Sequence, residues 1–400
     1  MRRRRVSVEN KWVQVWGQAH SALSYFYYPS CEKTFRLVIR SAVSGESVRF
    51  ELSNECAKED VHIGAMSVAR CDENGNFLDK CKTATVNSEK SPCLKVGEIA
   101  LSDEIPLHIE VGDYFCVSVF VEKGALRSGN LIDDATLVTV KGDVSHQGKI
   151  ENQRRKRDKV REVASSLLKM YFHKPIPLFQ SVQVLNGTGA GSIIVYGDSI
   201  SQQGYWTNAF AKRVKDAYPG RYAVVNKSIM GTRLLTDFST RFFCKGLFGK
   251  SGLNRVERDI LSYPDAEYVI VALGTNDFLQ PASIQAPKSE KRTASEFLEG
   301  MLTLNALVTK SGKRLIVFNI LNFGEGIDSR PWKEALVTET NKLLYENRDK
   351  FYGFYDQAGL CVNPEKPTCS KLELLGGDKV HPNKVGGQLV ADNVDLDLFK

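Results

Sequence analysis

The stretch Ser192-Ile193-Ile194-Val195-Tyr196-Gly197-Asp198-Ser199-Ile200 decides how the second half of the chain folds. It contains a short, continuous apolar run, which is typical of a strand that is buried on both faces. Comparable runs recur further along the chain, with segments of helical periodicity between them. The alternation predicts an α/β region with a parallel sheet that is covered by helices on both faces. The further runs are residues 222–225, 268–273, 315–320 and 351–355.

The helical segments between these runs each place apolar residues at intervals of three or four. We expect one helix around residues 206–217, a second around 297–308, and a final one from residue 383 onward. The expected buried faces are Trp206, Phe210, Val214 and Ala217 in the first, Phe297, Met301, Leu304 and Val308 in the second, and Val385, Leu389 and Val390 in the last.

Candidate residues for catalysis follow three of the predicted strands. Ser199 comes just after the first strand, Gly231 a few residues after the second, and Asn276 just after the third. In an open parallel sheet the carboxyl ends of the strands form one edge, and ligands bind there. The strand pattern therefore places these three residues at one edge of the sheet, independently of their chemistry.

Ser199 is a candidate nucleophile within Gly197-Asp198-Ser199-Ile200. A serine hydroxyl needs a base within hydrogen-bond reach, and His381 is the only histidine after residue 173. Asp378 lies three residues before His381, in Asp378-Lys379-Val380-His381-Pro382, and is expected to accept a hydrogen bond from the second ring nitrogen. Such a bond fixes the histidine tautomer and stabilises the protonated ring.

The tetrahedral intermediate of acyl transfer needs hydrogen-bond donors for its oxyanion. We expect three donors: the backbone N–H groups of Ser199 and Gly231, and the side-chain amide of Asn276 in Gly274-Thr275-Asn276-Asp277. Taken singly, Ser199 also fits a helix N-cap and Asn276 a turn residue. Their occurrence together, in this order, favours catalysis. Asp198 and Asp277 are expected to hold the loops.

These motifs resemble those of the SGNH (GDSL-type) hydrolase family over about residues 188–400. The second block is similar at Gly231 within Asn226-Lys227-Ser228-Ile229-Met230-Gly231, and Ile200 stands where the family's short name has leucine. The resemblance implies a flavodoxin-like parallel sheet and an esterase, lipase or carbohydrate deacetylase that needs no metal or other cofactor. It also implies the roles given above: Ser199 nucleophile, His381 base, Asp378 orienting residue, and Ser199, Gly231 and Asn276 as the oxyanion hole.

The first part of the chain has the two-residue period of antiparallel strands. Apolar residues alternate with polar ones around residues 35–39, 48–52 and 115–121, with turn sequences between. Closely spaced strands without helices predict an all-β sandwich or jelly roll. This part is similar to the extra β-domain of some bacterial members of the family. We expect a β-sandwich domain over residues 1–148, a basic helical linker over 149–185 and the hydrolase domain over 186–400.

The linker carries most of the positive charge. Residues 149–174 have a net charge of +6, against +7 for the whole chain. Residues 160–171 have the period of an amphipathic helix, and Arg154 to Arg157 are expected on its solvated face. So small a basic patch does not indicate a nucleic-acid partner. Gly187-Thr188-Gly189-Ala190-Gly191 precedes a strand, so we interpret it as a connection and not as a dinucleotide-binding loop.

Composition excludes some classes of protein. No apolar run approaches the roughly 20 residues of a membrane span. No secretory signal follows Arg2 to Arg5, so we expect a cytoplasmic protein, or a secreted one whose signal has been removed. The nine cysteines lack metal-type spacing. Free thiols are expected, and one or two disulfides in an exported form are the alternative.

The motifs predict a serine ester hydrolase. The common activities of the family that it resembles, together with the absence of a long apolar lid segment, imply that it removes small acyl groups, acetyl above all, from carbohydrate esters. Its partner is a small-molecule or carbohydrate ester, and the oligomeric state is open. One alternative is an esterase or lipase for longer or aromatic acyl groups. In that case residues 238–252, with Phe242, Phe243, Leu247 and Phe248, line an apolar acyl pocket. A second alternative is a carbohydrate-binding protein with a vestigial hydrolase domain.

Overall fold

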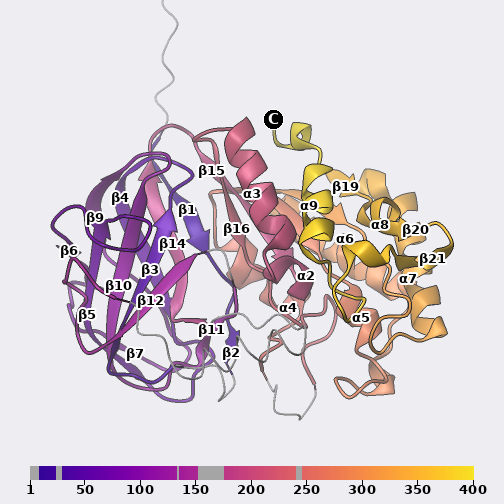
Figure 1. The fold of residues 1–400 in the computed structure, drawn as a ribbon, viewed down its shortest axis with the longest axis horizontal. Coiled ribbons are helices and arrows are strands. Elements are labelled where there is room, and N and C mark those ends of the chain that lie inside the picture. Colours follow the sequence, from indigo (N-terminus) through magenta and orange to yellow (C-terminus); the bar gives the residue numbers. More distant parts are fainter. Residues whose placement is uncertain (1–8, 24–28, 133–134, 152–174, 240–245) are drawn as a thin grey trace, which may run out of the picture.

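The structure, a computed structural model, describes residues 9–23, 29–132, 135–151, 175–239 and 246–400. It consists of an all-β region and an α/β region that lie side by side (Figure 1). The predicted helix over residues 160–171, with Arg154 to Arg157, lies outside the described residues. Within them, no helix is both long and apolar enough to cross a membrane, and the eight cysteines have free thiols.

The all-β region is a sandwich of two antiparallel sheets. One sheet has the order β1-β14-β4-β8, with β9 also paired to β4, and the other has the order β12-β3-β10-β5-β6, with β7 also paired to β5. A small third sheet has the order β13-β11-β2. The strands are β1 (Lys11–Gly17), β2 (Ser21–Ala22), β3 (Lys33–Arg40), β4 (Gly45–Ser53), β5 (Val61–Arg70), β6 (Lys82–Thr83), β7 (Cys93–Leu94), β8 (Ile99–Leu101), β9 (Ile105–Ile109), β10 (Tyr114–Lys123), β11 (Ser128–Asn130), β12 (Thr136–Lys141), β13 (Ile176–Pro177) and β14 (Phe179–Asn186).

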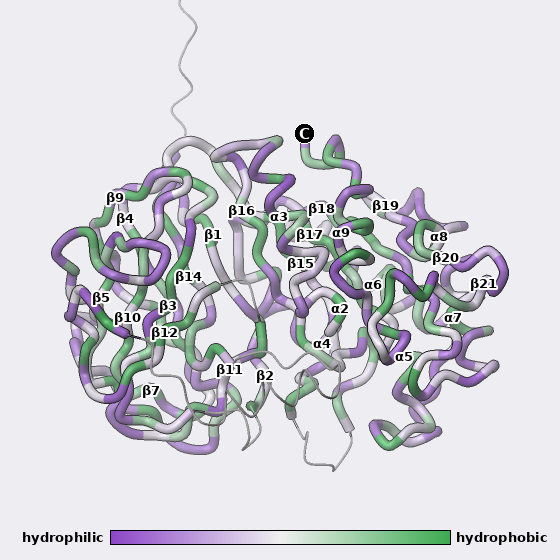
Figure 2. The backbone as a smooth tube through the Cα atoms, in the orientation of Figure 1, coloured by the Kyte–Doolittle hydropathy of each residue, from purple (hydrophilic) through white to green (hydrophobic). Residues whose placement is uncertain are grey.

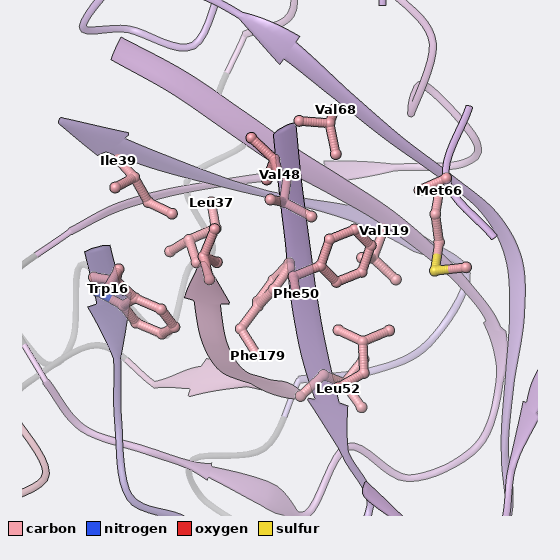
Figure 3. Packing of buried hydrophobic residues seen from close by; sticks show 14 of the residues in the cluster. Trp16, Leu37, Ile39, Val48, Phe50, Leu52, Met66, Val68, Val119 and Phe179 are labelled. Atoms are coloured by element: carbon pink, nitrogen blue, oxygen red, sulfur yellow. The ribbon is translucent and has the colours of Figure 1, made fainter. Parts of the chain in front are cut away.

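The core of the sandwich comes from the alternating residues that the sequence pattern indicated. Leu37 of β3, Phe50 of β4, Val119 of β10 and Phe179 at the start of β14 meet between the two sheets (Figure 3). Along these strands the trace changes repeatedly between hydrophilic and hydrophobic residues (Figure 2). The predicted β-sandwich is therefore confirmed.

The predicted linker over residues 149–185 is wrong at its C-terminal end. Residues 179–186 form β14, which pairs with β1 on one side and with β4 on the other. Pro175, Pro177 and the preceding basic residues suggested a connector, but Val182 and Val184 complete the apolar face of the five-stranded sheet. The last strand of the sandwich is therefore an interior strand, and residues 187–190 connect it directly to the α/β region.

The α/β region contains a five-stranded parallel sheet. The strands are β15 (Gly191–Gly197), β16 (Tyr222–Asn226), β17 (Ala266–Ala272), β18 (Arg314–Phe318) and β19 (Gly353–Tyr355). Their order in the sheet is β16-β15-β17-β18-β19, which is the flavodoxin-like order 2-1-3-4-5. All five strands coincide with the predicted apolar runs to within a few residues.

Helices cover both faces of this sheet (Figure 1). The helix α3 packs against α9 and closes one apolar cluster, and α6 packs with α7 over the other. The helices are α2 (Ser199–Gln202), α3 (Tyr205–Ala217), α4 (Gly252–Val256), α5 (Thr275–Leu279), α6 (Ala294–Lys310), α7 (Pro331–Glu346), α8 (Gln357–Cys361) and α9 (Lys384–Asp392), with a short hairpin of β20 (Val362–Asn363) and β21 (Lys366–Ser370) after α8.

The two regions share a buried interface in which β1 lies beside β16. The amide of Gln14 in β1 donates to a carboxylate oxygen of Asp265 at 2.9 Å. Lys227, at the end of β16, is fully buried, and its ammonium group lies 3.3 Å from the carbonyl oxygen of Gln18. Burial lowers the pKa of Lys227 to about 8. A buried cation at this boundary indicates that the two regions form one packed unit.

Candidate active site

Ser199 lies at the carboxyl edge of the sheet, where β15 ends and α2 begins. The side chain of Asp198 caps this helix by accepting a hydrogen bond from the amide of Ile200 at 3.0 Å. The amides in the first turn of a helix have no intrahelical acceptor. The N–H of Ser199 is therefore free of the helix ladder, and its hydroxyl is partly exposed on the same turn.

His381 lies on a short closed loop just before α9. The amide of Gly376 donates to the carbonyl oxygen of His381 at 2.7 Å, and the amide of Asn383 donates to that of Leu374 at 2.9 Å. Asn383 also caps α9 through its side chain, which accepts from the amides of Val385 and Gly386. These bonds fix the backbone on both sides of the imidazole ring.

The loop brings three of the predicted residues into a hydrogen-bonded row. The Oγ atom of Ser199 lies 2.7 Å from Nε2 of His381, and Nδ1 of His381 lies 2.5 Å from Oδ2 of Asp378. The other carboxylate oxygen of Asp378 accepts from the amides of Val380 and His381, each at 3.0 Å. Ser199 and His381 are 182 residues apart in the sequence, and only the fold brings them into contact.

The protonation states follow from this geometry. Burial disfavours the charge on Asp378, but the hydrogen bond and the charge of His381 outweigh it and lower the pKa of Asp378 to about 2. An ionised carboxylate only accepts hydrogen bonds, so Nδ1 of His381 carries the proton and Nε2 is free to accept one from Ser199. Burial of the imidazole by itself lowers the pKa of His381, but Asp378 and the charge of Asp198 raise it above 6.5.

Gly231 has a backbone conformation that suits glycine. Its φ angle is +71°, in the left-handed region that other L-residues rarely adopt. A Cβ atom at this position would lie 2.2 Å from Cγ of Phe248. The glycine therefore allows both the turn and the close approach of an aromatic ring. Within the described residues the amide of Gly231 has no hydrogen-bond acceptor, as an oxyanion donor requires.

Asn276 is the second residue of α5, at the carboxyl end of β17. Its Nδ2 atom lies 3.2 Å from Oδ2 of Asp198 and 3.2 Å from the carbonyl oxygen of Thr232. Both acceptors are at the long end of the hydrogen-bond range. The amide therefore faces the loops that carry Ser199 and Gly231, and its present partners hold it weakly.

Asp198 and Asp277 hold loops, as predicted. Asp277 accepts hydrogen bonds from the amides of Leu234 and Leu235 at 2.8 and 3.1 Å, and so ties the segment after Gly231 to α5. Burial raises the pKa of Asp198 and that of Asp277 to about 6. A buried carboxylate is destabilising unless hydrogen bonds satisfy it, and here both carboxylates have backbone amides as partners.

The sequence interpretation missed several residues that support this site. Gln203 donates to the carbonyl oxygen of Pro382 at 2.9 Å and links the segment that carries Ser199 to the loop that carries His381. Gln280 donates to the carbonyl oxygen of Gly231 at 2.7 Å. Each glutamine lies four residues after a predicted site residue, Ser199 or Asn276, and this helical spacing is the one signal in the sequence that could have found them.

The all-β region also contributes a supporting residue. Asn130, at the end of β11, donates from Nδ2 to the carbonyl oxygen of Ser228 at 2.8 Å. Its Oδ1 atom accepts a hydrogen bond from Nε2 of Gln202, in the helix of Ser199. One buried side chain of the sandwich thus joins α2, the helix that begins at Ser199, to the loop that leads to Gly231. No local pattern around residue 130 signals this role.

The aromatic segment that was considered for an acyl pocket is described only in part, because Phe242 and Phe243 lie outside the described residues. Leu247 and Phe248 are buried against Leu23 and Leu131 of the all-β region. The Phe238 ring lies edge-on to Phe248, with 4.7 Å between the centroids. In the described ranges no group of three histidine, cysteine or acidic side chains is arranged to hold a metal ion.

Comparison with protein families identifies the family to which the α/β half of the chain is similar. Residues 195–389 match the model of the GDSL-like Lipase/Acylhydrolase family. The chain therefore carries a GDSL-type hydrolase domain, and it is a carboxylic ester hydrolase. The matched segment contains Ser199, Gly231, Asn276, Asp378 and His381.

Several solved structures are similar to about half of the chain. An acetyl xylan esterase is 21% identical, with a TM-score of 0.38, over 50% of this chain and 96% of its own. An acetylxylan esterase from Geobacillus stearothermophilus is 17% identical, with a TM-score of 0.38, over 51% and 92%. A GDSL-like lipase from Bacteroides thetaiotaomicron is 14% identical, with a TM-score of 0.37, over 52% and 88%. No curated protein matched the chain.

Proposed function

We propose that the protein hydrolyses carboxylic esters through a triad of Ser199, His381 and Asp378, and that its substrates are acetyl esters of carbohydrates. The observation that carries the proposal is the continuous row of hydrogen bonds from Ser199 Oγ through His381 to Asp378, at 2.7 and 2.5 Å. Rows of this kind activate a serine for attack on a carbonyl carbon.

In the proposed reaction, Ser199 Oγ attacks the ester carbonyl while Nε2 of His381 takes its proton. Negative charge develops on the carbonyl oxygen and is stabilised by the amides of Ser199 and Gly231 and by the side chain of Asn276. The intermediate then expels the alcohol, which leaves with the proton from His381. Water, activated by the same histidine, hydrolyses the acyl-enzyme and regenerates Ser199.

The preference for a small acyl group rests on Phe248. The ring lies against Gly231, so close that even a methyl group on that residue would collide with it. The ring is itself buried among Leu23, Leu131 and Leu247. The apolar wall beside one proposed oxyanion donor is thus already packed, which favours an acyl group as small as acetyl. The carbohydrate part of the proposal rests on the activities of the family.

The first test is hydrolysis of p-nitrophenyl acetate by the wild-type protein beside Ser199→Ala. We expect the variant to lose about 10⁴-fold or more in kcat, the scale for a lost nucleophile. Ser201→Ala is a matched control, because this serine lies on the same helix but accepts a hydrogen bond from the indole of Trp206. Equal activity of wild type and Ser199→Ala would contradict the proposed nucleophile.

The second candidate activity is hydrolysis of longer or aromatic acyl esters. The observation in its favour is Phe238, whose ring is only partly buried and extends the apolar surface next to Phe248, with 4.7 Å between the ring centroids. A series of p-nitrophenyl esters from two to twelve acyl carbons separates the two activities. A maximum of kcat/KM at two carbons supports the acetyl proposal, and a maximum at eight or more carbons would replace it with this one.

A further inference from the structure

Gln280 has an unusual set of contacts beside the proposed oxyanion hole. It caps the C-terminus of α5, four residues after Asn276, and is 1% exposed. Its Nε2 atom donates to the carbonyl oxygen of Gly231 at 2.7 Å and to Oδ1 of Asn276 at 3.2 Å. One amide group therefore contacts two of the three residues proposed to bind the oxyanion.

The direction of these hydrogen bonds is fixed by chemistry. The backbone carbonyl of Gly231 can only accept, so Gln280 must present its nitrogen there. Because that nitrogen also faces Asn276, the asparagine must present Oδ1 to it. The Nδ2 atom of Asn276 is then turned the other way, toward Asp198 and Thr232. Asp198 and Thr232 also offer only acceptors, so their contacts select the same orientation of the amide, but each is 3.2 Å long. Gln280 adds a contact to the opposite end of the amide, from a side chain that is itself anchored on Gly231 at 2.7 Å.

The oxygen end of the Gln280 amide does not contribute to these contacts. Its Oε1 atom is buried and has no hydrogen-bond partner among the described residues. A buried polar atom without a partner lowers stability. An apolar side chain of similar size avoids this cost, so the glutamine is better explained by what its nitrogen does.

We propose that Gln280 is a positioning residue, which orients the Asn276 amide and anchors the Gly231 backbone so that both can donate to the oxyanion. The inference rests on the proposed function and adds to it a residue outside the three motifs. Gln280 acts through its two neighbours, and the inference requires no contact between its own side chain and the substrate. Its loss should therefore weaken stabilisation of the transition state and leave ground-state binding unchanged.

The test compares Gln280→Met and Gln280→Glu with the wild type on p-nitrophenyl acetate. Methionine keeps the size of the side chain and removes both hydrogen bonds, and we expect kcat to fall about 10- to 100-fold at constant KM, as for other residues that orient reactive groups. Glutamate places a carboxylate against two acceptors, so its kcat should fall further. Gln357→Met is the matched control, because that buried glutamine donates to the Asn319 carbonyl oxygen, outside the proposed site.

A double-mutant cycle with Asn276→Ala separates positioning from general damage. If Gln280 acts through Asn276, the effect of Gln280→Met on kcat should be at least about threefold smaller in the Asn276→Ala background. Fully additive effects, an unchanged kcat in Gln280→Met, or an equal loss in Gln357→Met would overturn the inference. Failure of the proposed function is distinguishable, because it appears first as an inactive wild type or an active Ser199→Ala.

Discussion

The carboxylate of Asp198 joins the two sides of the proposed site by accepting a hydrogen bond from the side-chain amide of Asn276, with 3.2 Å between Oδ2 and Nδ2. The same carboxylate caps the helix that begins at Ser199. A single buried acid therefore links the proposed nucleophile to one proposed oxyanion donor. A transition state requires this kind of fixed relation between groups that come from distant parts of the chain.

Asn276→Ala should lower kcat for p-nitrophenyl acetate by about 10²–10³, the cost of one oxyanion donor. KM should change little, because the negative charge exists only during the reaction. Asn305→Ala serves as a control, since this asparagine donates to the backbone of Lys350 on the surface. A loss of tenfold or less in Asn276→Ala would demote the residue to a structural role.

The rate should depend on pH through His381. The base must be neutral to accept the serine proton, and Asp378 and Asp198 raise the pKa of His381 above 6.5. We therefore expect kcat/KM to rise with pH and to level off, with a midpoint above 6.5. Asp378→Asn should move this midpoint down and reduce kcat by up to about 10⁴-fold. A flat profile of wild-type kcat/KM between pH 5 and 8 would exclude His381 as the base.

Gly231→Ala should damage the site through the backbone. The alanine must adopt a φ angle of +71°, and its Cβ meets the Phe248 ring at 2.2 Å. A left-handed conformation costs about 1–2 kcal/mol for a residue with Cβ, so the loop is expected to shift and kcat to fall. Adding Phe248→Ala relieves only the collision. Phe248→Ala also removes a buried ring, so the double variant is compared with Phe248→Ala alone. Beside that variant it should lose little further thermal stability but much of its kcat, which thermal unfolding and kinetics together would show.

Asn130→Ala tests whether the all-β region supports catalysis. The change leaves Ser228 and Gln202 without their partner, so the free energy of unfolding should fall by about 1–3 kcal/mol and kcat should fall as well. Asn54→Ala is the matched control, because this buried asparagine donates to three carbonyl oxygens within the sandwich. An equal loss of stability without a loss of kcat is expected there. The same result for Asn130→Ala would make its role purely structural.

Much of the fold and of the candidate site could be predicted from the sequence because it depends on local patterns. The five apolar runs correspond to β15–β19, and the sandwich strands follow their two-residue period. Because parallel strands end at one edge, the positions of Ser199 and Asn276 after their strands were enough to bring them together. The hydrogen bonds of His381 to Ser199 and Asp378 agree with the predicted triad, whose catalytic roles remain predictions.

The rest depends on contacts between distant segments, which no local pattern reveals. The pairing of β14 with β1 and β4 was missed for this reason, and so were the contacts of Asn130 and Gln280. The prediction that Val385 is buried is wrong for a different reason. Its spacing in the sequence predicted burial, but it is 63% exposed. Gly386 and Gly387 face inward instead, because α9 packs too closely on Leu374 and Tyr205 for a Cβ atom at either position. Ala217, at the end of α3, is likewise exposed.

The central position of β14 constrains the order in which a nascent chain can fold. As the protein leaves the ribosome, β1 and β4 emerge long before the strand that must lie between them. Until residue 186 has been synthesised, the five-stranded sheet lacks β14, and the edges of β1 and β4 that pair with it expose unpaired backbone groups. Only four residues separate the end of β14 from the start of β15, the first strand of the parallel sheet. The sandwich is thus completed almost at the moment when synthesis of the hydrolase domain begins.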